Sequence, residues 1–157
     1  MKLRPYRADD CVALVQLFRD TVRTVNARGY TLEQLAVWPP TDINLEKWQR
    51  SLSTHHSVAG VIGEVIVGFG DIDDSGYLDR LFVHHAHQGE GIGSAIVDWL
   101  EGKVDGDNTT EASITAKPFF LRRGYVVVRE QTVERQGVQL TNFLMIKKRS
   151  APTKNGV

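Results

Sequence analysis

The chain has 157 residues, of which 41% are apolar and 24% are charged, and this suits one globular domain with a sizeable core. The 19 basic and 19 acidic residues cancel, so no bulk field favours nucleic acid or an anionic membrane as a partner. Cys11 is the single cysteine, which excludes an internal disulfide and favours a reducing, cytoplasmic environment.

The first third of the chain is mainly helical in pattern. No long apolar stretch follows the start, so we expect neither a signal peptide nor a membrane span. A short strand is expected over residues 3–6. Apolar side chains then recur at helical spacing over residues 11–28, which predicts an amphipathic helix. Two shorter helices are expected over residues 31–36 and 44–51.

The middle of the chain changes to a β pattern. Three β-branched or apolar runs, separated by turn residues, predict strands over residues 57–62, 65–72 and 77–84. Alternation along the third strand places Leu81 and Val83 on one face. It places Leu78 and Phe82 on the opposite face, so this strand is expected to be central and covered on both sides.

The last third alternates between helices and strands. We expect helices over residues 91–103 and 117–123, and strands over residues 109–113, 126–133 and 138–146. The whole order predicts a single α/β domain over residues 1–147, with a mixed, mostly antiparallel sheet of about seven strands flanked by helices. The polar residues 148–157 are expected to form a flexible tail.

The most informative segment is Gln88-Gly89-Glu90-Gly91-Ile92-Gly93-Ser94, between the central strand and the next helix. Three glycines let the backbone approach a ligand closely, and the helix start directs free N–H groups to the same place, which favours phosphate binding. One alternative is a tight turn that binds nothing. Another is a nucleotide-binding regulator on a different α/β fold, but the G-x-G-x-x-G spacing of dinucleotide folds is absent.

Residues 81–94 resemble the cofactor motif of the GNAT superfamily of N-acetyltransferases, Q/R-x-x-G-x-G/A, with Gln88, Gly91 and Gly93 at the motif positions. Residues 116–125, AKPFFLRRGY, resemble the family's second stretch, A-x-x-F-Y-x-x-x-G-F. The order of elements also matches over nearly the whole chain. Residues 25–30 look like those of a small bacterial subgroup whose substrates are mostly unassigned.

The resemblance implies that acetyl-CoA is the cofactor and that its acetyl group passes directly to a primary amine of a small molecule or peptide. The diphosphate would lie on the N–H groups of the glycine loop, and the pantetheine arm would pair beside a splayed central strand. A homodimer is a further option by analogy. The implied cofactor contacts are Leu81, Phe82, Val83, Gln88, Gly89, Glu90, Gly91, Ile92, Gly93, Ser94, Ser113, Phe119 and Phe120.

The catalytic residues are less well defined by the pattern. Where the family often has a tyrosine that protonates the departing thiolate, this chain has Phe120, so another group or water would serve. This departure motivates an alternative function, a non-catalytic acyl-CoA-binding sensor or interaction module. The candidate bases are Asp79, expected on the face of Leu81 and Val83, and Glu111. Asp79 could equally form a structural ion pair with Arg80.

The acceptor pocket in the family is usually built by the early helices and their loop. In this chain, Tyr30, Gln34 and Trp38 combine aromatic walls with polar ends there, and we predict that they bind the substrate. Packing of a short helix on the sheet is the alternative.

A metal site is not expected. His84, His85 and His87 lie close together in the sequence, but side chains at a strand end point in different directions. No cysteine or carboxylate completes a ligand set, so a solvated loop or a phosphate contact is the favoured interpretation.

Overall fold

The computed structural model describes residues 1–24, 29–37 and 43–149. The strands are β1 (Lys2–Pro5), β2 (His56–Ile62), β3 (Val65–Ile72), β4 (Tyr77–Val83), β5 (Asn108–Ser113), β6 (Val126–Arg135) and β7 (Val138–Lys147). The α-helices are α1 (Cys11–Thr24), α2 (Leu32–Val37), α3 (Leu45–Thr54), α4 (Ile92–Glu101) and α5 (Lys117–Arg122). The elements follow the predicted order.

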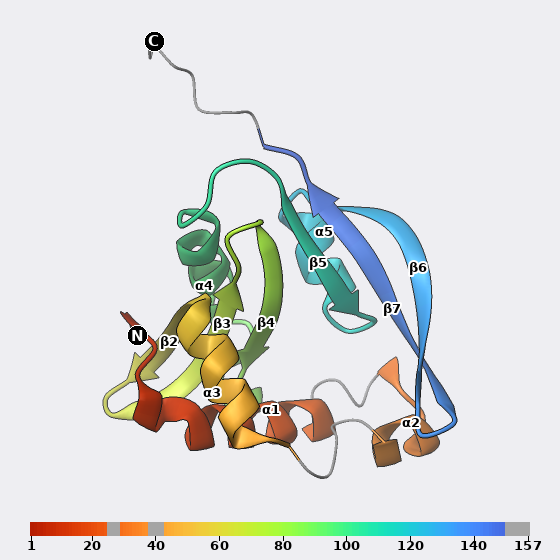
Figure 1. Cartoon of the computed structure of the whole chain (residues 1–157), viewed down its shortest axis with the longest axis horizontal. Helices are drawn as coiled ribbons and strands as arrows, with labels where there is room; N and C mark the ends of the chain where they lie inside the picture. The colour runs from red at the N-terminus through yellow and green to blue at the C-terminus, as the bar shows by residue number, and fades with distance from the viewer. Residues whose placement is uncertain (25–28, 38–42, 150–157) are drawn as a thin grey trace.

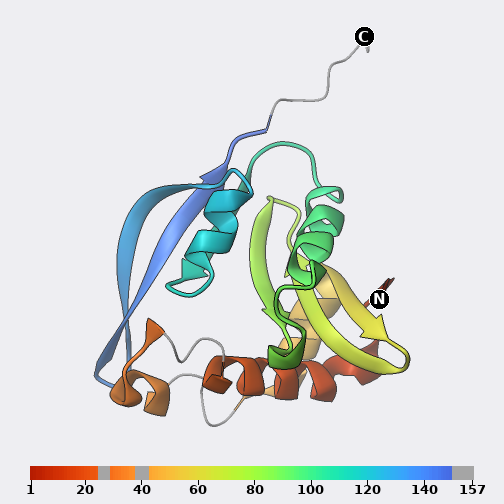
Figure 2. The same ribbon diagram turned by 180° about the vertical axis from the view of Figure 1, so that it is seen from behind.

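The described strands form one seven-stranded sheet in the order β1-β2-β3-β4-β5-β7-β6 (Figure 1). All neighbouring strands are antiparallel except β4 and β5, which are parallel and connected through α4. Helix α4 lies on one face of the sheet, and the view from behind shows it with α5 in front of the strands (Figure 2). The mixed, mostly antiparallel sheet that the sequence predicts is confirmed.

Two apolar clusters hold the helices on the sheet. On one face, α4 packs through Ile92, Ile96 and Leu100, all at most 2% exposed. On the other face, α1 and α3 enclose an aromatic group in which the Phe18 ring lies 5.0 Å from Phe82. Because each cluster buries many large side chains, each anchors one layer of helices to the central strands.

A β-bulge interrupts the central strand at Asp79. Asp71 of β3 pairs with Arg80, but the next residue, Ile72, pairs with Leu78, so Asp79 has no opposite residue. Bulges bend a strand and increase its twist. The bend occurs where β4 leaves its parallel neighbour, so the bulge marks the point at which the sheet opens.

Strands β4 and β5 are paired at only two positions, Tyr77 with Thr109 and Leu78 with Thr110. Beyond Leu78, β4 runs on to Val83 without pairing with β5, so the two strands splay apart (Figure 1). This split pair confirms the splayed strand that the GNAT resemblance implies.

The bulge also corrects one expectation from the sequence. Simple alternation groups Leu78 with Phe82, but Leu78 packs in the α4 cluster together with Leu81 and Val83. Phe82 instead packs in the α1 and α3 cluster. The predicted grouping is wrong because the extra residue, Asp79, shifts the alternation by one position.

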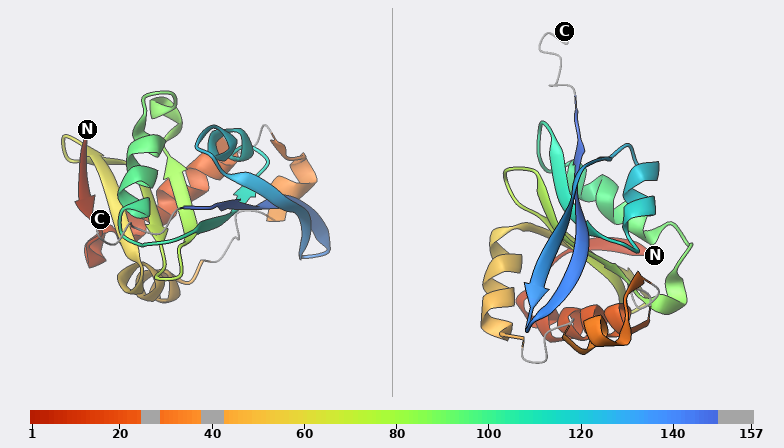
Figure 3. Two further views of the ribbon diagram at one scale, coloured as in Figure 1. Left: turned by 90° about the horizontal axis from the view of Figure 1, so that it is seen from above. Right: turned by 90° about the vertical axis from the view of Figure 1, so that its right-hand side faces the viewer.

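The β6–β7 hairpin extends beyond the rest of the sheet, and its far end lies beside α2 (Figures 1 and 3). Gln34 on α2 donates a 2.8 Å hydrogen bond to the Gln139 carbonyl on β7. At the other end of β7, Arg149 donates to the Glu101 carbonyl at 2.7 Å and to Asn108 at 3.0 Å. Arg149, which the sequence assigns to the tail of residues 148–157, therefore contacts the domain, and residues 150–157 lie outside the described residues.

Helix α1 is described as far as Thr24. The sequence extends this helix to residue 28, and residues 25–28 lie outside the described residues. Of the helices described, none combines the length and the apolar character that crossing a membrane would require.

Gly76 fixes the start of the parallel pair, because its carbonyl accepts a 3.0 Å bond from the Thr109 N–H. Its φ is +92°, and an added Cβ would lie 2.3 Å from the Asp107 carbonyl oxygen. We expect Gly76→Ala to lower the free energy of unfolding by about 3 kcal/mol or more, measured by urea denaturation.

Gly106→Ala is the matched control, because Gly106 has a φ of +85° and, within the part of the chain that the structure describes, no heavy atom lies within 4 Å of an added Cβ. It carries only the strain of a left-handed backbone, about 1–2 kcal/mol. Equal losses in the two variants would contradict the close contact assigned to Gly76.

Candidate active site

A cavity of about 540 Å³ opens where β4 and β5 separate. Its walls come from both strands, from the glycine loop, from α5 and, at Thr21, from α1. Of the implied cofactor contacts, the structure brings all but Glu90 to this cavity, namely Leu81, Phe82, Val83, Gln88, Gly89, Gly91, Ile92, Gly93, Ser94, Ser113, Phe119 and Phe120. Both candidate bases, Asp79 and Glu111, line it as well.

The glycine loop closes one end of the cavity with exposed backbone. Gly89 and Gly91 have φ values of +75° and +82°, a conformation that favours glycine. An added Cβ at either position would meet no heavy atom of the described residues within 4 Å, so this part of the structure leaves open space there. The backbone conformation therefore favours glycine at these positions, and the open space beside them is accessible to a ligand.

Helix α4 starts directly behind the loop. Its first backbone hydrogen bond runs from Ala95 N–H to the Gly91 carbonyl, at 3.0 Å. The N–H groups of the preceding residues have no carbonyl partner within the helix, as at every helix N-terminus. Together with the helix dipole, these groups form an environment that favours an anion such as phosphate.

Side chains fix the loop against the end of β4. Gln88 donates a 2.7 Å hydrogen bond through Nε2 to the Val83 carbonyl, which joins the loop to the strand that lines the cavity. His87, which lines the cavity, has its Nδ1 3.0 Å from a carboxylate oxygen of Glu90. Glu90 thus pairs with His87 at the surface, and its role in cofactor binding stays a prediction.

The histidines before the loop have local structural partners. His84 accepts a 3.0 Å hydrogen bond from the Ala86 N–H, and its ring stacks on His85 with centroids 4.2 Å apart. These contacts order the turn that leads from β4 into the loop.

Aromatic residues of α5 form the opposite wall. Phe120 is 2% exposed and packs edge-on against Tyr125 with ring centroids 5.0 Å apart. The Tyr125 hydroxyl donates a 2.8 Å bond to Glu101, so this residue is part of the core. Phe119 is less buried, and its ring lies 3.4 Å from the position of an added Cβ on Gly93.

Asp79 sits at the bulge, on the cavity side of β4. One of its oxygens lies 3.4 Å from Arg80 Nη1, and 34% of its side chain is exposed. Desolvation by the surrounding protein raises the pKa of Asp79 and outweighs the opposing attraction of Arg80. A carboxylate with a raised pKa is suited to accept a proton near neutral pH.

Glu111, on β5, is engaged through both of its carboxylate oxygens. One accepts a 3.1 Å bond from the Tyr77 hydroxyl, and the other accepts a 3.1 Å bond from Gln131. Both candidate bases therefore border the same cavity. They differ in their partners, because Glu111 accepts hydrogen bonds from two neutral side chains whereas Asp79 lies beside the guanidinium of Arg80.

Two of the predicted acceptor residues, Tyr30 and Gln34, contact the β6–β7 hairpin rather than the cavity. The Tyr30 hydroxyl donates to the Thr141 carbonyl at 3.3 Å, and Gln34 joins α2 to β7. Neither is among the described residues that line the cavity. Trp38 lies outside the described residues. The role of all three in acceptor binding stays a prediction.

Two features were missed in the sequence. Thr21, in α1, lines the cavity, and its buried hydroxyl has no hydrogen-bond partner among the described residues. Asp71, the lone charge in the apolar run of β3, is fully buried and contacts both His55 and Arg80. A charge within a buried strand is a detectable signal, because such residues are rarely buried unless paired.

Comparison with known proteins identifies the family. The model of the acetyltransferase (GNAT) domain matches residues 26–147, which include β2 to β7 and the glycine loop. The chain belongs to the GNAT family.

Individual GNAT relatives agree with this assignment. The uncharacterized N-acetyltransferase YafP of Escherichia coli K12 is 32% identical over 145 residues, which cover 92% of this chain and 94% of that protein. A GCN5-related N-acetyltransferase of Rhodopseudomonas palustris is 29% identical with a TM-score of 0.88, covering 94% of this chain and 95% of that one. The structure of yncA from Salmonella typhimurium with acetyl-CoA, 15% identical, shares the fold at a TM-score of 0.71, with 98% of each chain covered.

His55 offers a test of the charges beside this GNAT cavity. Its hydrogen bond to Asp71 raises the pKa of the imidazole, so protonated His55 stabilises the fold. That contribution is fully present below the ordinary histidine pKa of about 6.5 and is lost as pH rises through the raised folded value. We therefore expect His55→Gln to lower the free energy of unfolding more at about pH 6 than at about pH 9, measured by urea denaturation.

His56→Gln is the control for this measurement. His56 pairs at 2.8 Å with Asp74, whose side chain is 93% exposed, so the substitution is expected to cost little at either pH. A loss in His55→Gln that is larger at high pH would contradict the pairing with Asp71.

Proposed function

We propose that this GNAT protein is an acetyl-CoA-dependent N-acetyltransferase that moves the acetyl group directly to a primary amine of a small molecule or peptide. The observation that carries the proposal is the splayed β4–β5 pair, which opens onto a cavity closed at one end by the glycine loop. The fold shared with yncA, whose structure contains acetyl-CoA, supports the same substrate here.

The glycine loop would hold the diphosphate of acetyl-CoA. The N–H groups at the start of α4 would donate to its oxygens, and the open space beside Gly89 and Gly91 would accommodate them. Because the Gln88 side chain ties the loop to Val83, the phosphate position is fixed relative to β4.

The gap between β4 and β5 would hold the pantetheine arm. Beyond Leu78 the inner edge of β4 has no pairing with β5, so backbone groups at Leu81 and Val83 are positioned to pair with an extended amide chain. A backbone N–H of β4 would also polarise the thioester carbonyl, as an oxyanion hole does. Ser113 and Phe119, across the gap, would contact the arm.

Asp79 is the base that this geometry favours. Acetyl-CoA supplies the activated acyl group, and the amine nitrogen forms the new C–N bond as the C–S bond breaks. Asp79 would accept the proton that the amine must lose, and its raised pKa matches that task better than the hydrogen-bonded Glu111. Because Phe120 has no proton to donate, water would protonate the thiolate.

The buried Phe120 favours one alternative, a sensor that binds acyl-CoA without turnover. Thiol release measured with a panel of amines separates the two functions. Steady release with any amine would exclude the sensor. As part of the enzyme proposal, we predict that the acceptor is bound by Tyr30, Gln34 and Trp38. A homodimeric assembly is a further prediction.

Gly91→Val tests the diphosphate site. A side chain there would fill the space assigned to the phosphates and remove charge-assisted hydrogen bonds of about 1.5–3 kcal/mol each. We expect the affinity for acetyl-CoA, measured by calorimetric titration, to fall about a hundredfold or more.

Gly63→Val is the matched control, since Gly63 also has a positive φ, +62°, and no described heavy atom within 4 Å of an added Cβ, but lies in the β2–β3 turn. It is expected to bind acetyl-CoA as the wild type does. Unchanged affinity in Gly91→Val would contradict the placement of the diphosphate.

Asp79→Asn tests the base. We expect kcat to fall about 10²- to 10⁴-fold, as is typical for loss of a general base, while the affinity for acetyl-CoA stays unchanged. In the wild type, kcat/KM should fall as pH drops through the pKa of Asp79, which lies above the ordinary range of aspartate because burial raises it. Glu111→Gln is the comparison, and a larger loss there would transfer the role to Glu111.

A further inference from the structure

Asp71 is a buried carboxylate with one oxygen left without a partner. Its side chain is 0% exposed, and Oδ2 lies 2.5 Å from Arg80 Nη1 and 2.7 Å from His55 Nδ1. Oδ1 is also buried, yet no donor among the described residues reaches it. An unsatisfied charged oxygen in the interior is costly, so its retention calls for a physical reason.

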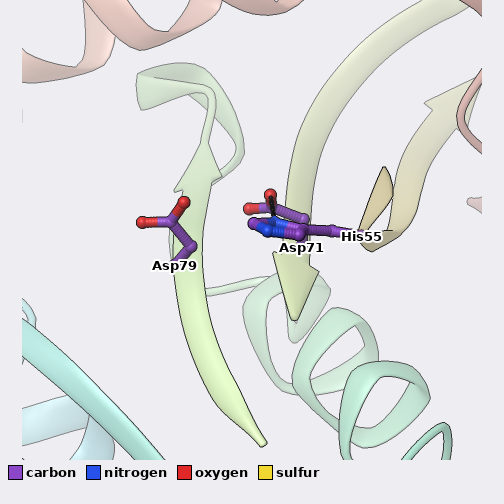
Figure 4. Close-up of side chains that lie close together, drawn as sticks. All are labelled: His55, Asp71 and Asp79. Atoms are coloured by element: carbon purple, nitrogen blue, oxygen red, sulfur yellow. Dashed lines mark hydrogen bonds and ion pairs between the residues drawn. The ribbon is translucent and has the colours of Figure 1, made fainter. Parts of the chain in front are cut away.

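Asp79 is the neighbour that supplies such a reason. The bulge places it beside the Asp71–Arg80 pair, and Figure 4 shows the Asp71 carboxyl group pointing toward the strand that carries Asp79. A carboxylate oxygen of Asp79, one of Asp71 and a ring nitrogen of His55 all lie within 4.8 Å of one another. One water, or a rotation of the Asp79 side chain, spans such a distance.

The charges around Asp79 come from several elements. Asp71 on β3 and Asp73 in the following turn disfavour its ionised form, whereas Arg80 on β4 and His55 at the end of α3 favour it. Tyr77 lies on the same strand and donates to Glu111 of β5. His55 is itself held by the hydrogen bond to Asp71, which keeps its charge close enough to attract the Asp79 carboxylate.

We propose that Asp71 and His55 are positioning residues for Asp79, an inference that rests on the proposed function. When Asp79 takes the proton of the amine, an N–H bond breaks, an O–H bond forms, and the nitrogen electron pair is released for the bond to the acyl carbon. The protonated Asp79 then donates a hydrogen bond toward Asp71 Oδ1. Before that step, His55 and Arg80 balance the charge of Asp71, so that two neighbouring carboxylates can both be ionised.

A metal ion bound by the same three residues is a weaker explanation. The guanidinium of Arg80 already pairs with Asp71 Oδ2. The same guanidinium also lies over Trp48, with its Cζ atom 4.5 Å from the centroid of the ring. A second cation would have to displace or oppose this fixed positive charge. The ion-pair network therefore accounts for the arrangement without a metal.

The test is the pH dependence of kcat/KM, measured in the presence of a chelator. The acidic limb of this profile is the fall of kcat/KM as pH drops through the pKa of Asp79. Removing the positive charge in His55→Gln should move this limb to higher pH by about half a unit or more. His55→Lys, which keeps a positive charge, should leave the limb near its wild-type position. Asp71→Asn removes a negative charge and should move the limb to lower pH, with a reduced plateau.

His56→Gln is the matched control, since it alters the adjacent histidine without touching Asp71. A purely structural role would lower activity in both Asp71→Asn and His55→Gln without opposite shifts. The proposal would be overturned if the two variants shift the acidic limb in the same direction, or if neither shifts it. It would also be overturned if His56→Gln shifts the limb equally, or if adding the chelator to the wild type moves it. If Asp71→Asn does not fold, as shown by its thermal melt, the His55→Gln and His55→Lys pair decides.

Asp79→Asn separates this inference from the proposed function. If that variant keeps both the wild-type rate and the acidic limb, then Asp79 is not the base and the proposed function fails in its catalytic part. If Asp79→Asn loses the limb but the His55 and Asp71 variants do not shift it in opposite directions, only the positioning proposal fails.

Discussion

The site depends on the short pairing between β4 and β5. Two residue pairs join these strands, and the bulge at Asp79 turns β4 away directly afterwards. A parallel pair that continued would satisfy its own backbone groups and close the cavity. Because it stops, the sheet has an internal edge, lined by Leu81 and Val83, that an extended ligand can occupy.

The same bulge connects the cavity to the charges of the neighbouring strand. It places Asp79 beside Arg80, which holds the buried Asp71, and beside His55 at the end of α3. An internal strand edge, a helix start whose first N–H groups have no partner within the helix, and a carboxylate with a raised pKa thus meet in one place. The GNAT fold provides the first two features, and the side chains of this chain provide the third.

Much of this could be predicted from the sequence, for identifiable reasons. The glycine loop and the strands are encoded locally, by residues whose backbone preferences do not depend on distant partners. The bulge was missed because it is a property of register between two strands, and alternation alone therefore grouped Leu78 with Phe82. The contacts of Asp71 with His55, and of Gln34 with β7, join residues far apart in the sequence, so no local pattern carries them.

The central claim is that acetyl-CoA lies along the internal edge of β4 with its diphosphate on the start of α4. A crystal structure of the protein grown with coenzyme A tests this most directly. The claim predicts phosphate oxygens within hydrogen-bond distance of the N–H groups of residues 89–94 and a pantetheine arm between β4 and β5. Coenzyme A bound elsewhere, or a closed gap between the strands at saturating ligand, would contradict it.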